Sequence, residues 1–145
     1  MTIDESAPTL RHPGFDASSA ARWHRTLPDH LAVLLRNAHA DEQEALGPHL
    51  RAAYLLTRQV ISALLRAGYP ARLLAAEHGV RSETIRTRAQ AGWMHLGDIA
   101  ALAGIDEDEL ARRCAADGAV VEDGRLHSDD LTRILSAPAT TRDGQ

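Results

Sequence analysis

The amino-acid sequence predicts an all-α fold, a helical bundle with one short β-hairpin near its end. Apolar residues recur at steps of three and four over most of the chain, which is the period of a helix with one buried face. Proline and glycine stand where such stretches begin and end. The length of 145 residues fits one domain, with two small lobes that share a core.

The two ends of the chain differ from its middle. Residues 1–16 and 138–145 are rich in proline, glycine and charged residues, a composition typical of disordered segments. Between them we expect a helical domain over 17–91 and an acidic lobe over 92–137. No apolar run approaches the roughly 18 residues that a membrane span needs. The acidic N-terminus is unlike a signal peptide, and a single cysteine fits a reducing compartment, so we expect a cytoplasmic protein.

Two helices are expected before residue 48. Ser18 or Ser19 can cap a short helix that runs through Trp23 to Leu27. Asp29 can cap a second helix, which ends near residue 47. These residue types are favoured at helix starts because their side chains accept hydrogen bonds from free backbone N–H groups.

A longer helix is expected to begin at Pro48, because the fixed φ of proline suits a first helical turn. It ends at Gly68, and Pro70 starts the next helix. The residues expected to face the core are Leu50, Ala53, Tyr54, Val60, Ile61, Leu64 and Leu65.

The most informative pattern lies in residues 71–90. Ala75 stands four residues before Gly79, and Ile85 follows six residues after that glycine. A small residue such as Ala75 lets two helices approach closely where they cross, and Gly79 adopts the positive φ of a sharp turn without strain. Val80 and Ile85 then fill the wedge between the helices. The spacing predicts a helix-turn-helix at 70–91, within a three-helix unit over about 48–91.

Charge sets the same region apart. Residues 49–91 carry seven Arg and two acidic residues, a local net charge of +5, whereas residues 1–48 carry −3 and residues 92–145 carry −6. All sixteen basic residues are Arg, whose guanidinium suits bidentate contacts with phosphate and guanine. A basic island at such a motif is the electrostatic footprint expected for nucleic acid.

The segment GYPARLLAAEHGVRSETIRTRAQ, residues 68–90, resembles the helix-turn-helix of bacterial transcription regulators. The chain as a whole resembles small actinobacterial or actinophage DNA-binding proteins. This resemblance implies a transcriptional regulator that binds double-stranded DNA sequence-specifically, with a docking helix over 82–91 in the major groove. Proteins of this kind commonly bind as dimers, and the helices over 29–68 are the candidates for a homodimer interface. An intramolecular core would use the same apolar stripe.

Residue types on and before the docking helix indicate individual DNA contacts. Arg86 is the best candidate for a base edge, because a guanidinium matches guanine O6 and N7. Glu83 can accept from cytosine N4, Gln90 can read adenine, and Arg72 and Thr84 are expected at phosphates. The other expected DNA-binding residues are Arg81, Ser82, Thr87 and Arg88. For each outward Arg, a solvated surface charge is the alternative.

Two residues depart from the motif. His78 and Arg88 stand where apolar side chains are usual. Arg88 is expected to extend over the core and reach a phosphate.

A second copy of the spacing lies 25 residues downstream, in LGDIAALAGIDEDELARR. It predicts a second helix-turn-helix-like unit over about 96–116. Its second helix would begin with the four carboxylates of residues 106–109, which should repel phosphates. Two interpretations remain open. Asp106 can be an N-cap whose acidic neighbours complement the helix dipole, or the face can contact a basic partner or mimic DNA.

The segment GAVVEDGRLH predicts the hairpin, with valines at 120–121 on one strand, a turn at 123–124 and Leu126 on the other strand. Ser128 is expected to cap the last helix. The order of helix, turn, helix and hairpin suggests a winged arrangement. Because Arg125 and His127 lie beside acidic residues, the wing is expected to be structural.

Little in the sequence indicates catalysis or a metal site. The histidines lie far apart, and one cysteine cannot complete a zinc finger. No phosphate-binding glycine loop or nucleophile elbow is present. Cys114 is expected in the core, and Trp93 is expected to pack between the two repeats. We therefore expect no enzyme, metal or cofactor. The rival function is a protein–protein adaptor, whose acidic 92–137 lobe engages a basic partner.

Overall fold

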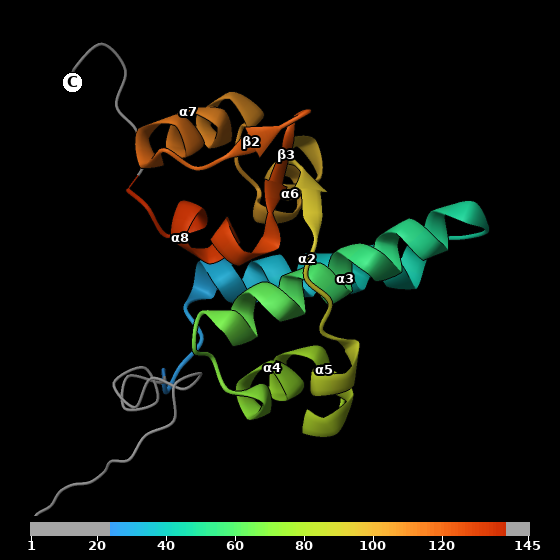
Figure 1. Cartoon of the computed structure of the whole chain (residues 1–145). Helices are drawn as coiled ribbons and strands as arrows, with labels where there is room; N and C mark the ends of the chain where they lie inside the picture. The colour runs from blue at the N-terminus through green and yellow to red at the C-terminus, as the bar shows by residue number, and fades with distance from the viewer. Residues whose placement is uncertain (1–23, 139–145) are drawn as a thin grey trace, which may run out of the picture.

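The structure, a computed structural model, describes residues 24–138 (Figure 1). These residues are mostly helical, as predicted, and include a small antiparallel sheet. A hairpin of two long helices, α2 (Asp29–Glu44) and α3 (Pro48–Arg66), crosses the middle of the molecule. The short helices α4 (Ala71–His78) and α5 (Ser82–Arg88) lie on one side of it. On the other side lie α6 (Leu96–Ala103) and α7 (Glu107–Asp117), together with the sheet.

The sheet has three strands, β1 (Trp93–His95), β2 (Val121–Glu122) and β3 (Arg125–His127), in the order β1-β3-β2. The predicted hairpin corresponds to β2 and β3, although Val120 lies outside the strand. Strand β1 was not predicted, because only Met94 of its three residues is buried and so short a strand carries no alternating pattern. The expectation that Trp93 packs between the repeats is wrong: its side chain is exposed and meets the edge of His127.

One cluster of buried residues runs through both halves of the chain. It joins Leu34 and Leu64 of the central hairpin to Ile85 of α5 and to Leu110 of α7. The basic segment before residue 91 and the acidic segment after it therefore differ in net charge but share one hydrophobic core. Three residues of the predicted core-facing set of α3 differ: Leu50 is exposed, and Tyr54 and Leu65 are half-buried.

The two short helix pairs share the same turn. Gly79 and Gly104 both adopt the left-handed conformation, with φ of 75° and 72°. Their N–H groups donate to the carbonyls of Ala75 and Ala100 at 2.8 Å and 2.9 Å. The repeated spacing in the sequence thus corresponds to a repeated local geometry.

The N-terminal helices differ in part from expectation. Residues 24–28 are not helical, so the short helix does not extend to Leu27, and Pro28 rather than Asp29 occupies the N-cap position of α2. Ser18, Ser19, Trp23 and the segment 1–16 lie outside the described residues, as does the predicted tail after Pro138.

Ser128 does not cap the last helix. It begins a short 3-10 helix, η1 (Ser128–Asp130), which precedes α8 (Leu131–Leu135). The capping acceptor is the Nδ1 of His127, which receives the N–H of Asp129 at 3.0 Å. The buried Ser128 hydroxyl instead accepts from the N–H of Gly92 at 3.0 Å, and the N–H of Ser128 donates to the carbonyl of Gly92 at 2.8 Å.

Replacing Ser128 by alanine is expected to lower the free energy of unfolding by about 2 kcal/mol, because the N–H of Gly92 loses its acceptor in a part-buried position. Urea unfolding followed by circular dichroism measures the change. The Ser136→Ala exchange is the control: it also removes a hydroxyl hydrogen bond, to His30 at 2.9 Å, but in an exposed position, so its expected effect lies within about 0.5 kcal/mol. Equal effects of the two exchanges would contradict the prediction.

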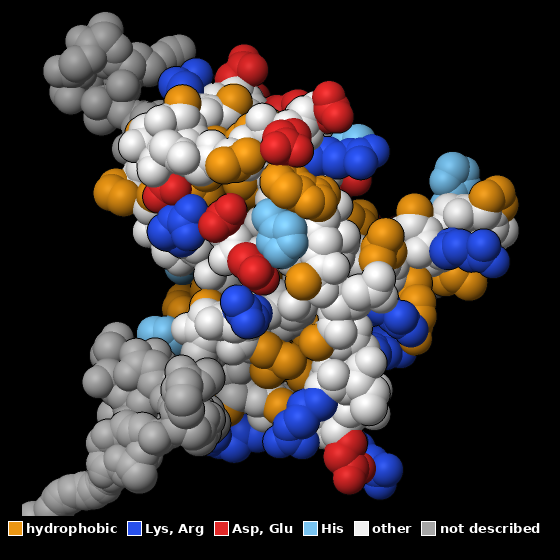
Figure 2. Space-filling model, viewed as in Figure 1, with side chains coloured by type: hydrophobic (Ala, Val, Ile, Leu, Met, Phe, Trp, Pro, Cys, Tyr) orange, Lys and Arg blue, Asp and Glu red, His pale blue; other side chains and the backbone are white. Residues whose placement is uncertain are grey.

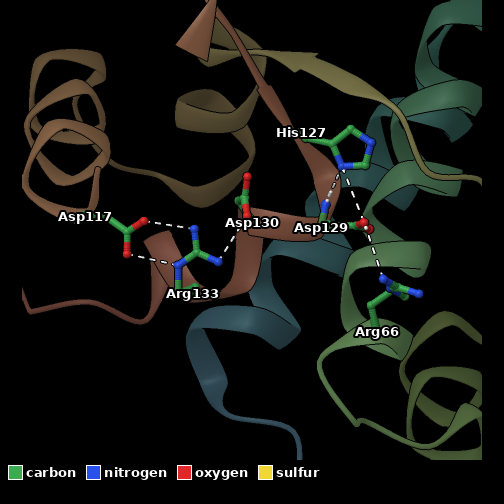
Figure 3. Close-up of polar contacts among 6 residues, drawn as sticks. All are labelled: Arg66, Asp117, His127, Asp129, Asp130 and Arg133. Atoms are coloured by element: carbon green, nitrogen blue, oxygen red, sulfur yellow. Dashed lines mark hydrogen bonds and ion pairs between the residues drawn. The ribbon is translucent and has the colours of Figure 1, made fainter. Parts of the chain in front are cut away.

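Ion pairs join the elements on the acidic side of the molecule (Figure 3). Arg133 of α8 donates to both carboxylate oxygens of Asp117 at 2.9 Å and 2.8 Å, and it lies 3.0 Å from Asp130. The hydrogen bond from Arg133 lowers the pKa of the Asp117 carboxyl. Arg66 of α3 lies 3.6 Å from Asp129. These contacts tie α7 to α8 and η1 to the central hairpin.

Candidate nucleic-acid interface

Helix α5 presents one polar face to solvent, and the rest of the helix is half-buried or buried. Ile85 is fully buried and anchors the helix on the core. Arg86 and Thr87 are exposed, and so are Arg81 and Glu83, which form a loose ion pair at 3.6 Å. One buried apolar residue therefore holds a short helix whose outward face is polar.

Arg72 and Arg86 come together beside α5. They line a hollow of about 390 Å³ at the junction of α3 and α4, whose other lining residues are Leu65, Gly68, Tyr69, Pro70 and Ala71. Two guanidinium groups from different helices thus border one concave surface with an apolar floor.

The surface charge is segregated (Figure 2). Arginine side chains gather over α4 and α5, and acidic side chains gather over the side that holds α7 and the sheet. The segregation follows the sequence, because α4 and α5 on one side of the central hairpin come from the basic segment, and the elements on its other side come from the acidic one.

The docking helix is shorter than predicted. It ends at Arg88, and Ala89 has extended backbone angles. Gln90 lies beyond the helix, where its N–H donates to the carbonyl of Arg58 at 3.1 Å and its side-chain oxygen accepts from Arg58 at 3.3 Å. The expected helix over 82–91, with Gln90 on its outer face, is therefore wrong, because the chain turns there toward β1. Ser82 and Thr84 are half-buried.

The Arg88 side chain is folded back onto the molecule, with 22% of its surface exposed. Its Nη1 donates to Nε2 of His78 at 2.9 Å and lies 3.9 Å from a carboxylate oxygen of Glu42. Its guanidinium also lies over the ring of Tyr54, 5.1 Å from the centroid. The expected extension of Arg88 to a phosphate is not seen. The two residues that depart from the apolar pattern, His78 and Arg88, are instead partners.

This buried polar cluster is incompletely paired. Within residues 24–138, no hydrogen-bond partner reaches Oε1 of Glu42, Nε of Arg58 or Nδ1 of His78. Burial lowers the pKa of His78 to about 4, with further contributions from the nearby charges of His39 and Arg88. A neutral His78 is the form that can accept from Arg88.

Sequence reasoning missed the other members of the cluster. Glu42 belongs to α2, and Tyr54 and Arg58 belong to α3, with Arg58 stacked 4.3 Å from the Tyr54 ring centroid. Spacing along the chain relates none of them to Arg88. The available signal was the pair of polar residues at two positions where apolar ones are usual.

The second helix pair presents a different face. Asp106, Glu107 and Asp108 are exposed, and none has an ion pair with any residue from 24 to 138. Glu109 differs, since it pairs with Arg112 and Arg113 at 3.2 Å and 2.8 Å. Asp106 occupies the N-cap position, but its side chain makes no capping hydrogen bond. Three carboxylates are therefore left in solvent at the start of α7.

The histidines and Cys114 were the other residues considered for chemistry. No group of three or more metal-ligating side chains is present in residues 24–138. Cys114 is buried, and burial raises the pKa of its thiol. None of the described helices is both long enough and apolar enough to cross a bilayer. Comparison with protein-family models, curated proteins and solved structures finds no match to this chain.

Proposed function

We propose that the chain binds double-stranded DNA as a sequence-specific transcriptional regulator, with α4 and α5 as its helix-turn-helix. The observation that carries the proposal is the setting of α5. Ile85 is the one fully buried residue of α5, and the exposed face of the helix lies in the basic region, beside the hollow bordered by Arg72 and Arg86. An exposed helix in a basic region is what major-groove docking requires.

The side chains of this region take different roles. Arg86 reads a base edge, because it is exposed near the middle of α5. Arg72 binds a phosphate from α4, and Arg81, Glu83 and Thr87 lie at the groove. Ser82 and Thr84 contribute only at the edge of the interface, since they are half-buried. Arg88 and Gln90 hold the end of α5 to the central hairpin through the contacts described above.

Anisotropy titration of labelled random-sequence duplex DNA across a salt series tests the proposal. The wild-type chain should bind with a Kd of about 10⁻⁴ to 10⁻⁶ M, and binding should weaken steeply as salt rises. Arg86→Glu should weaken it by at least about tenfold. The matched control is Arg112→Glu, which makes the same charge change on α7.

Two outcomes would refute DNA binding through α5. One is no binding at low salt. The other is an equal loss in the Arg86 and Arg112 variants, which would show that net charge alone governs binding. If the first test succeeds, selection from a random library identifies the preferred site.

A second candidate function is a protein–protein adaptor. The observation in its favour is the unpaired carboxylates at the start of α7, on the face that corresponds to the DNA-docking face of the first helix pair. A basic protein partner would neutralise them. Replacing Asp106, Glu107 and Asp108 by Asn and Gln should then abolish protein binding that occurs without DNA, while leaving the Arg86-dependent DNA binding intact.

A further inference from the structure

The hollow beside α5 lies where the described part of the chain begins. The N–H of His24 donates to the carbonyl of Gly68 at 3.2 Å, and the His24 ring stacks on Tyr69 with the ring centroids 4.2 Å apart. Gly68 and Tyr69 both line the hollow of about 390 Å³ that Arg72 and Arg86 border. The first 23 residues of the sequence are therefore attached at the rim of this hollow.

The hollow can accept an apolar group next to an anion. Its apolar lining residues are Leu65, Tyr69, Pro70 and Ala71. Arg72 and Arg86 are exposed, and neither forms an ion pair with a residue of 24–138. Two such guanidinium groups favour a carboxylate ligand, because a guanidinium can donate to both oxygens of one carboxylate.

The N-terminal segment, residues 1–16, contains groups that match this hollow. Phe15, the single phenylalanine of the chain, is followed directly by Asp16. The segment holds three acidic residues and one Arg, so it is acidic where the hollow is basic. An aromatic ring supplies a large apolar area for the lining, and the adjacent carboxylate supplies the anion.

The connection between Asp16 and the hollow is short. Residues 17–23 join Asp16 to His24, and an extended chain covers about 3.5 Å per residue, or roughly 28 Å over these eight steps. A tether of this length holds a group near its site at an effective concentration on the order of 1 mM. Even a weak contact, with a dissociation constant of about 0.1 mM, is then roughly nine-tenths occupied.

We propose that this hollow binds the N-terminal segment of the same chain. The Phe15 ring lies on the apolar lining, and the Asp16 carboxylate meets the two guanidinium groups. The other apolar residue that precedes an aspartate in the segment is Ile3. Phe15 is the better anchor, because its ring buries more apolar area and its tether to His24 is shorter.

The docked segment has a consequence for DNA that rests on the proposed function. Arg72 and Arg86 are the proposed phosphate and base contacts, so the segment and the duplex compete for the same two cations. If the hollow is occupied roughly nine-tenths of the time, the apparent affinity for DNA falls about tenfold. The chain thus limits its own access to DNA.

Amide ¹H–¹⁵N NMR spectra of the full chain, recorded without DNA, test the docking. The variant Phe15→Ser/Asp16→Asn should shift the resonances of the residues that line the hollow. The matched control is Ile3→Ser/Asp4→Asn, which also removes one apolar side chain and one carboxylate from the segment. The control should leave the same resonances in place. Circular dichroism verifies that each variant is folded.

Anisotropy titration with the random-sequence duplex at low salt tests the competition. Phe15→Ser/Asp16→Asn should bind DNA about tenfold more tightly than the wild-type chain does. The control Ile3→Ser/Asp4→Asn makes the same change of net charge, and its affinity should stay within about twofold of wild type. Equal gains in the two variants would show that net charge alone weakens DNA binding, and they overturn the competition.

The docking and the proposed function fail separately. Unshifted resonances around the hollow in Phe15→Ser/Asp16→Asn overturn the docking, even if DNA binding depends on Arg86. Shifts that grow with protein concentration also overturn it, since the segment would then dock on a second copy. Shifts confined to the Phe15→Ser/Asp16→Asn variant, in a chain that binds no DNA, support the docking and overturn the proposed function alone.

Discussion

Replacing Arg88 by alanine is expected to lower the free energy of unfolding by roughly 3 kcal/mol. Arg88 is the cation beside the largely buried carboxylate of Glu42, whose second oxygen already lacks a partner within the described residues. Without the guanidinium, a negative charge remains in a poorly hydrated place. His78 also loses the donor to its Nε2. Urea unfolding followed by circular dichroism measures the loss.

A matched exchange exists on the same helix. Arg86 lies two residues before Arg88 and is exposed, so Arg86→Ala should change the stability by no more than about 0.5 kcal/mol. The double variant Glu42→Gln/Arg88→Met removes both charges and should recover most of the stability that Arg88→Ala loses. If Arg88→Ala lowers the free energy of unfolding no more than Arg86→Ala does, the ion pair with Glu42 contributes little to stability.

Lowering the pH below 6.5 is expected to destabilise the protein through His78. The ordinary histidine pKa is 6.5, and in the folded chain it is about 4. Between these values the unfolded chain binds a proton that the folded chain does not, so the unfolding free energy falls as the pH falls. Above pH 6.5 His78 is neutral in both states, and the unfolding free energy does not depend on its titration. Between pH 6.5 and 4 the unfolding free energy falls by about 1.4 kcal/mol per pH unit. Below pH 4 it levels off, after a total loss of about 3 kcal/mol.

The variant His78→Gln isolates this effect from the carboxylates that also titrate below pH 5. Glutamine retains an acceptor for Arg88 but does not titrate, so the difference in stability between the two proteins should vary with pH between 6.5 and 4. Denaturant unfolding at a series of pH values measures it. The exposed His95→Gln exchange is the control and should reproduce the wild-type slope. Parallel curves for His78→Gln and wild type would refute the role of His78.

Much of the helical framework could be predicted from local pattern. Helix α3 begins at Pro48, as expected from the fixed φ of proline, and ends before the left-handed Gly68. Gly79 and Gly104 both end helices with positive φ. These boundaries could be predicted because each depends on the backbone angles that a single proline or glycine can adopt.

Part of the candidate site could also be predicted from the sequence. The exposure of Arg86 and the burial of Ile85 follow from their positions on a helix with one buried face. The end of α5 could not be predicted in this way. It depends on the hydrogen bond between the N–H of Gln90 and the carbonyl of Arg58, which lies 32 residues earlier.

The sequence by itself determined the helical class, the repeated turn and the separation of basic from acidic segments, since each depends on residues close together in the chain. Only the tertiary structure decided that β1 joins the sheet, that Arg88 lies with Glu42 and His78, and that Leu50 and Leu55 stay exposed. These features depend on which helices pack together, and the burial of an Arg or the exposure of a Leu is settled by neighbours distant in sequence. Local pattern states what each residue prefers, and packing decides which preferences are met.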